Sequence, residues 1–425
     1  MRRRASRIVL MFALTLTPAL TASAGAKEKV LHRFRGGSDG AYPSSRLLMD
    51  AAGNLYGTTD LGGNLDCNNG APGSGCGVVF ELTPSANGKW REKVLYAFVG
   101  QPDGLEPNGN LVFDARGNLY GTTGAGGTGT GCVAYKGCGT VFELSPHADG
   151  KWTETVLYSF QALSDGEFPA GLTLDAAGNL YGTTLVTAYE LSPPGPHSAV
   201  WTEKTIYTPP FFLSPGLIFD SKGNLYGDTA AVLGGSGYGV VFQLKFSNGS
   251  WTETDLYDFL GGGNGGSPTT GLVFDKKGNL YGTGESGGNN QGIAFELKHS
   301  GDRWSEAMLY EFCSLNYCAD GAYPTAGLVM DSDGAFYGTT YEGGACMVCG
   351  VVFKLARTKD GWKETVLYDF RGGLHDGVGP AEPLILDRDG NLYGTASTQS
   401  SYPGYGIVFE LQPTASQRIR TLSTK

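Results

Sequence analysis

The sequence predicts an all-β fold, a seven-bladed β-propeller of four-stranded antiparallel blades. Three observations support this prediction. The motif N-L-Y-G-T, or a close variant, occurs seven times; four strand-sized segments recur in a fixed order; and the two ends of the repeat array complement each other. Four strand-sized segments that recur in a fixed order are typical of propeller blades.

The four segments are rich in β-branched and aromatic residues and are bounded by Gly, Asn, Asp or Pro, as strands are. The first is L-x-x-D, which ends at Asp50, Asp114, Asp175, Asp220, Asp275, Asp331 and Asp387. The second is N-L-Y-G-T, with its tyrosine at Tyr56, Tyr120, Tyr181, Tyr226, Tyr281, Tyr337 and Tyr393. The third is V-F-E-L or a variant, and the fourth is W-x-E followed by L-Y-x-F. One repeat pattern across the chain predicts a single domain over residues 25–412.

The ends of the array predict how the ring closes. The N-terminal segment V-L-H-R-F is a lone strand of the fourth type, and the last repeat stops after a strand of the third type, I-V-F-E-L. We therefore expect residues 29–34 to complete the C-terminal blade. Closure would remove the exposed strand edges that an open array leaves.

A glycine follows the tyrosine in every second strand, as Gly57 does after Tyr56. A glycine inside a strand usually marks the close approach of another group. We expect Gly57 and its six counterparts to be notches that receive an aromatic side chain from the adjacent blade.

Residues 1–24 have the pattern of a signal peptide. Arginines precede a short apolar run, and T-A-S-A-G resembles a cleavage site. This predicts export to the periplasm or the extracellular space, with no membrane span in the mature chain and a flexible tail over residues 413–425.

The charge balance argues against nucleic acid as a partner. Without the four arginines of the leader, 27 basic residues face 41 acidic ones, so the mature chain has a net charge of −14. Such a chain lacks the clustered cations that bind phosphate backbones.

The pattern L-x-x-D-x-x-G-N-L-Y-G-T-T, followed by G-G and G-x-V-F-E-L, resembles the GloVer-type tandem repeat of "choice-of-anchor" secreted bacterial proteins. The resemblance covers essentially the whole mature chain. It implies export and display outside the cytoplasm, and it implies no activity. The C-terminal segment Q-P-T-A-S-Q-R-I-R-T-L-S-T-K departs from the family pattern because it shows no hydrophobic anchor.

Two sets of residues are candidates for ligand binding. The motif D-G-x-x-P precedes the first strand of five blades, and its aspartates are expected near the axis: Asp39, Asp103, Asp165, Asp320 and Asp376. Asp-Gly is also an ordinary turn sequence, so these residues have a purely structural alternative. The fourth blade has Phe211 and Phe212 instead, which form a ligand platform if exposed and fill the blade if buried.

Eight cysteines form four close pairs in the sequence: Cys67/Cys76, Cys132/Cys138, Cys313/Cys318 and Cys346/Cys349. In an exported chain this pattern predicts disulfides. A four-cysteine zinc site or cross-pairing between the last two pairs remains an alternative at this stage.

Connections between second and third strands vary most in length, and they share one face with the D-G-x-x-P segments and the cysteines. We call this the loop-rich face, and we expect function there because variable loops on a rigid frame carry binding sites. The sequence predicts a monomeric binding or display module for a glycan, a peptide or a surface protein. No catalytic motif, metal site or cofactor signature is visible. The alternative is an extracytoplasmic hydrolase or lyase with a carboxylate or tyrosine site near the central channel.

Overall fold

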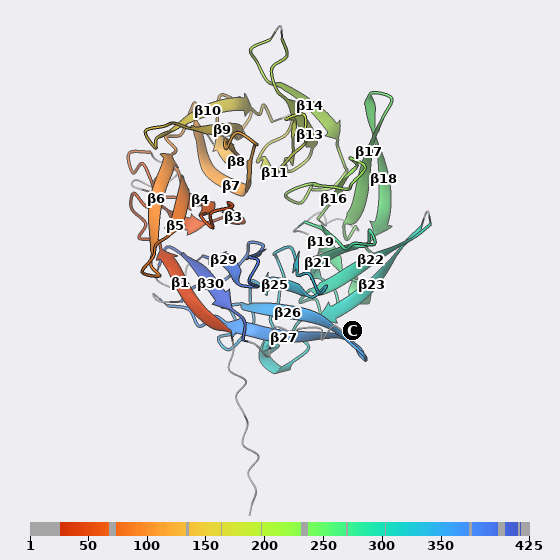
Figure 1. The fold of residues 1–425 in the computed structure, drawn as a ribbon. Helices are drawn as coiled ribbons and strands as arrows, with labels where there is room; N and C mark the ends of the chain where they lie inside the picture. Colours follow the sequence, from red (N-terminus) through yellow and green to blue (C-terminus); the bar gives the residue numbers. More distant parts are fainter. Residues whose placement is uncertain are drawn as a thin grey trace, which may run out of the picture.

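The computed structural model describes residues 26–414 and 417, except 68–73, 133–135, 163, 197, 231–236, 269–270, 302, 374–375 and 398–403. Its strands form seven antiparallel sheets arranged in a ring (Figure 1). The predicted seven-bladed propeller is confirmed. The expected signal peptide lies outside the described residues, as does most of the expected tail. The described residues contain no helix that is long and apolar enough to cross a membrane.

Blades are numbered one to seven, from the sheet that holds Tyr56 to the sheet that holds Tyr393. The innermost strands are β3 (Leu48–Met49), β7 (Gly104–Phe113), β11 (Ala170–Leu174), β15 (Ile218–Phe219), β20 (Val273–Phe274), β24 (Val329–Met330) and β28 (Ile385–Leu386). The second strands are β4 (Leu55–Leu61), β8 (Leu119–Gly126), β12 (Leu180–Thr183), β16 (Leu225–Asp228), β21 (Leu280–Ser286), β25 (Phe336–Thr340) and β29 (Leu392–Ala396).

The third strands are β5 (Val78–Pro84), β9 (Thr140–Pro146), β13 (Ala188–Ser192), β17 (Val240–Ser247), β22 (Ile293–Ser300), β26 (Val351–Thr358) and β30 (Ile407–Gln412). The outer strands are β6 (Trp90–Ala97), β10 (Trp152–Ser159), β14 (Thr202–Tyr207), β18 (Ser250–Asp258), β23 (Arg303–Glu311), β27 (Gly361–Asp369) and β1 (Lys27–Arg33). Short strands β2 (Ala41–Pro43) and β19 (Gly266–Pro268) extend two blades. The 3-10 turns are η2 (Gly262–Asn264) and η3 (Asn316–Cys318).

The N-terminal strand closes the ring as the sequence predicts. β1 pairs antiparallel with β30, from Lys27 opposite Gln412 to Arg33 opposite Ile407. A further backbone hydrogen bond of 3.0 Å joins the Phe34 amide to the Gly406 carbonyl. The seventh blade is therefore built from both ends of the propeller sequence.

Aromatic side chains join neighbouring blades. At several interfaces, a tryptophan at the start of an outer strand lies edge-on against the second-strand tyrosine of the preceding blade. The ring centroids are 6.3 Å apart for Trp90 and Tyr393, and 6.4 Å apart for Trp201 and Tyr120. Because each blade supplies part of its neighbour's core, the apolar clusters lie between blades as well as within them.

The prediction for the second-strand glycines needs a correction. Each of them does receive an aromatic ring, but the ring comes from the third strand of the same blade. A Cβ atom on Gly57 would lie 2.7 Å from Cζ of Phe80, the residue directly opposite it in the pairing of β4 with β5. The phenylalanine ring folds over its cross-strand partner because only a glycine leaves that space empty.

A second set of glycines controls how blades approach each other. A Cβ atom on Gly77 would lie 2.4 Å from Cδ of Pro107 in the next blade. The same contact occurs at six of the seven interfaces: Gly77–Pro107, Gly139–Pro169, Gly239–Pro268, Gly292–Pro324, Gly350–Pro380 and Gly406–Pro43. Between blades three and four both partners are absent, and a bond of 2.9 Å from the Leu213 amide to the Leu185 carbonyl joins the blades there.

Replacing Gly121 with valine tests the notch. A Cβ atom there would lie 2.5 Å from Cζ of Phe142 and 2.7 Å from Cδ2 of Leu111. We expect Gly121→Val to lower the free energy of unfolding by about 1–3 kcal/mol, because overpacking forces side chains off their rotamers. Gly195→Val is the matched control, since nothing lies within 4 Å of a Cβ atom there. Denaturant unfolding of both variants measures the difference, and equal stabilities would contradict the role assigned to the notch.

Candidate functional site

A cavity of about 390 Å³ lies on the propeller axis, where the innermost strands of all seven blades begin. The residue just before each L-x-x-D segment lines it. This residue is glycine in four blades, at Gly171, Gly216, Gly271 and Gly327. Charged side chains enter the cavity only from blades one and seven, through Arg46 and Glu382, among the lining residues that the structure describes. The repeat symmetry is therefore broken on one side of the axis.

Arg46 places a guanidinium group in this cavity. Its side chain is accessible from the cavity, yet the surrounding inner strands enclose it, and this burial lowers its pKa. The four ion pairs found within the described ranges do not include Arg46. Because this guanidinium is accessible and has no carboxylate partner among the described residues, it is suited to bind an anion that enters the cavity.

Glu382 faces the same cavity from the seventh blade. Burial, reinforced by the negative charge of Asp60, raises the pKa of this carboxyl to about 8. Burial also raises the pKa of Asp60, at the end of β4, to about 6. At neutral pH Glu382 therefore carries a proton and can donate a hydrogen bond, while Arg46 supplies the positive charge of the cavity.

Asn110 also lines the cavity, but its amide has a structural role. Its Nδ2 donates to the Leu172 carbonyl at 2.7 Å, and its Oδ1 accepts from the Leu172 amide at 3.1 Å. This pair of bonds joins the inner strands of blades two and three and leaves little of the amide for a ligand.

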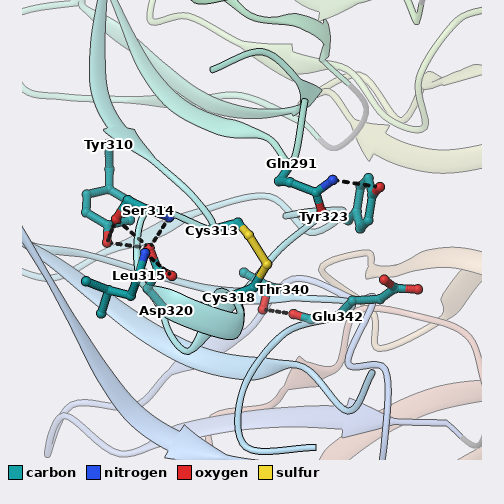
Figure 2. The surroundings of a disulfide bond; sticks show 10 residues. All are labelled: Gln291, Tyr310, Cys313, Ser314, Leu315, Cys318, Asp320, Tyr323, Thr340 and Glu342. Carbon is teal, nitrogen blue, oxygen red and sulfur yellow. Dashed lines mark hydrogen bonds between the residues drawn. A yellow bond between two sulfur atoms is a disulfide. The ribbon is translucent and has the colours of Figure 1, made fainter. Parts of the chain in front are cut away.

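The five aspartates of D-G-x-x-P do not line the axial cavity. Each caps the connection that follows an outer strand. In blade six, Asp320 accepts hydrogen bonds from the Tyr310 hydroxyl at 2.8 Å, the Ser314 hydroxyl at 2.7 Å and the Leu315 amide at 3.2 Å (Figure 2).

The other four aspartates lie in equivalent places. Asp103 accepts from Tyr96 and from the Val99 amide, both at 3.0 Å. The remaining three contact the residues of the same connection: Asp39, Asp165 and Asp376. These bonds hold the carboxylates within the turns, although the buried Oδ1 of Asp103 has no hydrogen-bond partner among the described residues. A ligand-binding role for the five aspartates stays a prediction.

Phe211 and Phe212 lie outside the axial cavity as well. Phe212 is 39% exposed, and Phe211 is half-buried. Cε1 of Phe211 lies 2.8 Å from the position that a Cβ atom on Gly237 would occupy. The pair thus combines partial exposure with packing against the connection before β17, and its role as a ligand platform stays a prediction.

All four cysteine pairs form local disulfides: Cys67–Cys76, Cys132–Cys138, Cys313–Cys318 and Cys346–Cys349. Cross-pairing between the last two pairs does not occur, and their thiols are not free to bind zinc. Blade six nevertheless brings both pairs together, because the Gly344 amide donates to the Cys318 carbonyl at 2.9 Å. Figure 2 shows the Cys313–Cys318 bond beside Asp320. Four disulfides are typical of proteins outside the reducing cytosol.

Arg46 and Glu382 are not among the residues predicted from the sequence, because neither belongs to a motif that repeats from blade to blade. The signal that could have found them is a position near L-x-x-D at which one blade departs from the residues of the others. Arg46 stands where four blades have glycine, and Glu382 stands one residue further from L-x-x-D, where the other blades have Ser, Gly, Ala, Pro or Thr.

A second group of carboxyls has raised pKa values but repeats in every blade. It is the glutamate of the outer strand: Glu28, Glu92, Glu154, Glu203, Glu253, Glu306 and Glu364. Six of them have a buried Oε1 without a hydrogen-bond partner among the described residues. Because they are spread around the circumference, they cannot converge on one ligand.

The fold and the cavity define a class: a seven-bladed β-propeller with an asymmetric polar site on its axis. Within this class, the chain belongs to the Gloeobacter/Verrucomicrobia repeat family, whose model matches residues 17–192 and 186–409. No curated protein matches the sequence.

Two solved structures illustrate the fold. Virginiamycin B lyase from Staphylococcus aureus is 12% identical, with a TM-score of 0.56, over 92% of this chain and 99% of that one. A candidate 6-phosphogluconolactonase from Bacteroides fragilis is 12% identical, with a TM-score of 0.50, over 80% and 86% of the two chains. At this identity the similarity concerns the fold alone.

The outer-strand glutamates predict how stability depends on pH. Burial, followed by the charge of Asp103, raises the pKa of Glu154 from 4.5 to about 7. The folded protein therefore holds this proton more tightly than the unfolded chain does. The resulting stabilisation is full below pH 4.5 and is lost as the pH rises through 7.

We expect Glu154→Gln to be more stable than the parent protein at pH 8, by less than about 1 kcal/mol because the group is partly solvated. Near pH 4.5 the two should be nearly equal. Asp360→Asn removes an exposed carboxylate and serves as the control. Thermal unfolding across this pH range measures the difference, and a stabilisation by Glu154→Gln that is independent of pH would rule out a titration effect.

Proposed function

We propose that this protein is an exported binding module whose axial cavity takes a small anionic ligand. The observation that carries the proposal is the guanidinium of Arg46, which lines the cavity, is accessible and has no ion-pair partner among the described residues. Pockets for small molecules typically combine an apolar wall with a few polar groups that fix the ligand. Here Leu172, Leu217 and Ile218 contribute apolar wall.

Arg46 and Glu382 have different roles in this proposal. Arg46 binds the negative group of the ligand. Glu382, protonated at neutral pH, donates a hydrogen bond to the ligand without repelling it. Binding of a glycan, peptide or surface protein by the loop-rich face, with Phe211, Phe212 and the five aspartates, stays a separate prediction.

A second candidate function is hydrolysis or elimination with Glu382 as general acid. A carboxyl whose pKa is about 8 keeps its proton at neutral pH, which is what a general acid requires. Arg46 would then stabilise the negative charge that develops on the substrate. This candidate differs from simple binding in one respect, since it requires turnover that Glu382→Gln abolishes.

The test is a thermal-shift and calorimetry screen of the purified protein with glucuronate, gluconate, citrate and inorganic phosphate. A ligand at about 100 times its Kd should stabilise the protein by about 2.7 kcal/mol. We expect at least one of these anions to bind and Arg46→Gln to weaken it about tenfold or more. Binding should also weaken as the pH rises through 8, because ionised Glu382 repels an anion.

Glu382→Gln is the matched variant, since it keeps the shape of the side chain and removes the titration. It should bind at neutral pH and lose the decline in affinity above pH 8. Affinity that is unchanged in Arg46→Gln would refute the assignment of the site to the axis.

A further inference from the structure

A second hollow lies at the opposite end of the propeller from the loop-rich face. It is a groove of about 1000 Å³ between blades four and five, which are neighbours in the ring (Figure 1). Its walls are the turns between the first and second strands of the two blades, together with parts of β17 and the start of β23. None of its lining residues lines the axial cavity.

Four lysines gather in this groove, although the mature chain is strongly acidic. Lys222, Lys276 and Lys277 lie in the two turns, and Lys245 lies on β17. All four side chains are exposed. The ion pairs found in the part of the chain that the structure describes include none of them.

Most carboxylates of this groove already accept hydrogen bonds from neighbouring residues. Asp220 and Asp275 each accept four hydrogen bonds within their own turns, including one from the tyrosine of their blade. Asp255 is the third acidic lining residue. Four lysines against three aspartates leave the groove with a net positive charge.

Comparison with other blades shows that the groove departs from the repeat. In five blades, the V-F-E-L position is a glutamate, and its carboxylate accepts from the second-strand tyrosine at 3.1 Å in Glu81 and 2.9 Å in Glu296. Blade four has Gln243 instead, which donates to Tyr226. Blade four therefore lacks this negative charge in the same groove that contains the four lysines.

The groove between blades two and three is a natural control. It has the equivalent tyrosine and tryptophan, Tyr120 and Trp201. However, it keeps the glutamate of the repeat, Glu143, and it has Ala177 at the position of Lys277 in the groove between blades four and five. Its volume is about 350 Å³. A cavity that combines lysines with a lost glutamate is therefore not a general consequence of the fold.

Aromatic rings line the groove beside the lysines. Trp304 packs against His299 with ring centroids 4.7 Å apart and ring planes tilted by 38°, and Phe246 is 52% exposed. Flat apolar surfaces next to cations suit a ligand that has both ring faces and negative groups. A chain of uronate sugars has this chemistry, since each unit has a carboxylate and an apolar ring face.

We propose that the groove between blades four and five binds an acidic oligosaccharide, with its carboxylates on Lys222, Lys245, Lys276 and Lys277 and its ring faces on Trp304 and Phe246. An exported protein meets polyanions of this kind outside the cell. The site does not depend on the proposed function of the axial cavity.

The test is calorimetric titration of the full chain with an oligogalacturonate of defined length. We expect binding that weakens as ionic strength rises and is absent with a neutral maltooligosaccharide of equal length. Gln243→Glu should weaken binding about tenfold, because it restores the charge that five other blades have at this position. A double variant, Lys276→Ala with Lys277→Ala, should lose at least as much.

Glu143→Gln in the groove between blades two and three is the matched control and should leave the affinity unchanged. Gln243→Glu places a residue that the repeat already accommodates, so loss of folding is not expected. The proposal is overturned if oligogalacturonate does not bind, or if Gln243→Glu and the lysine variant bind as the parent does. Equal affinity for oligoglutamate would assign the groove to acidic peptides instead.

Discussion

The pairing of β1 with β30 is the interaction on which the rest of the structure depends. Apolar clusters of this propeller lie between blades. One cluster, for example, joins Leu31, Tyr393 and Val408 of the seventh blade to Leu55 and Phe80 of the first. An open ring would leave such a cluster without one of its walls and would expose strand edges. Because the two ends of the propeller sequence lie in one sheet, backbone hydrogen bonds between β1 and β30 close the ring. The closed ring is then one cooperative unit.

Closure of the ring also explains why repeated residues have structural roles, whereas functional roles are expected for residues that occur in one blade only. A residue that occurs in every blade occupies seven equivalent places around the axis, and it contributes to packing or turns. The outer-strand glutamates show this clearly, because their raised pKa values resemble those of catalytic carboxyls, yet they are far apart by symmetry. Arg46, Glu382 and Gln243 each occur in one blade only at their positions, and each lies beside a cavity. Function in this fold is best sought in departures from the repeat.

Much of the architecture could be predicted from the sequence, since strand patterns and their complementary ends are local features of the chain. Blade number and closure were both accessible in this way, whereas the pairing of the last four cysteines was settled only by the structure. The partner of Gly57 was not, because the sequence shows that an aromatic ring is near but not whether Phe80 of the same blade or a ring of the next blade fills the space. The position of Asp320 was also beyond reach, since Asx-turn geometry decides which way the carboxylate points.

The axial cavity and the groove share a physical logic. Both place cations without ion-pair partners among the described residues on a frame whose sevenfold packing already determines the backbone. Such groups add little to stability, and the partial desolvation of Arg46 detracts from it. A frame built from repeated interfaces can accommodate that cost at one or two blades, because the other blades supply the same contacts unchanged. The two sites lie at separate ends of the molecule and share no lining residue, so each can change without altering the other.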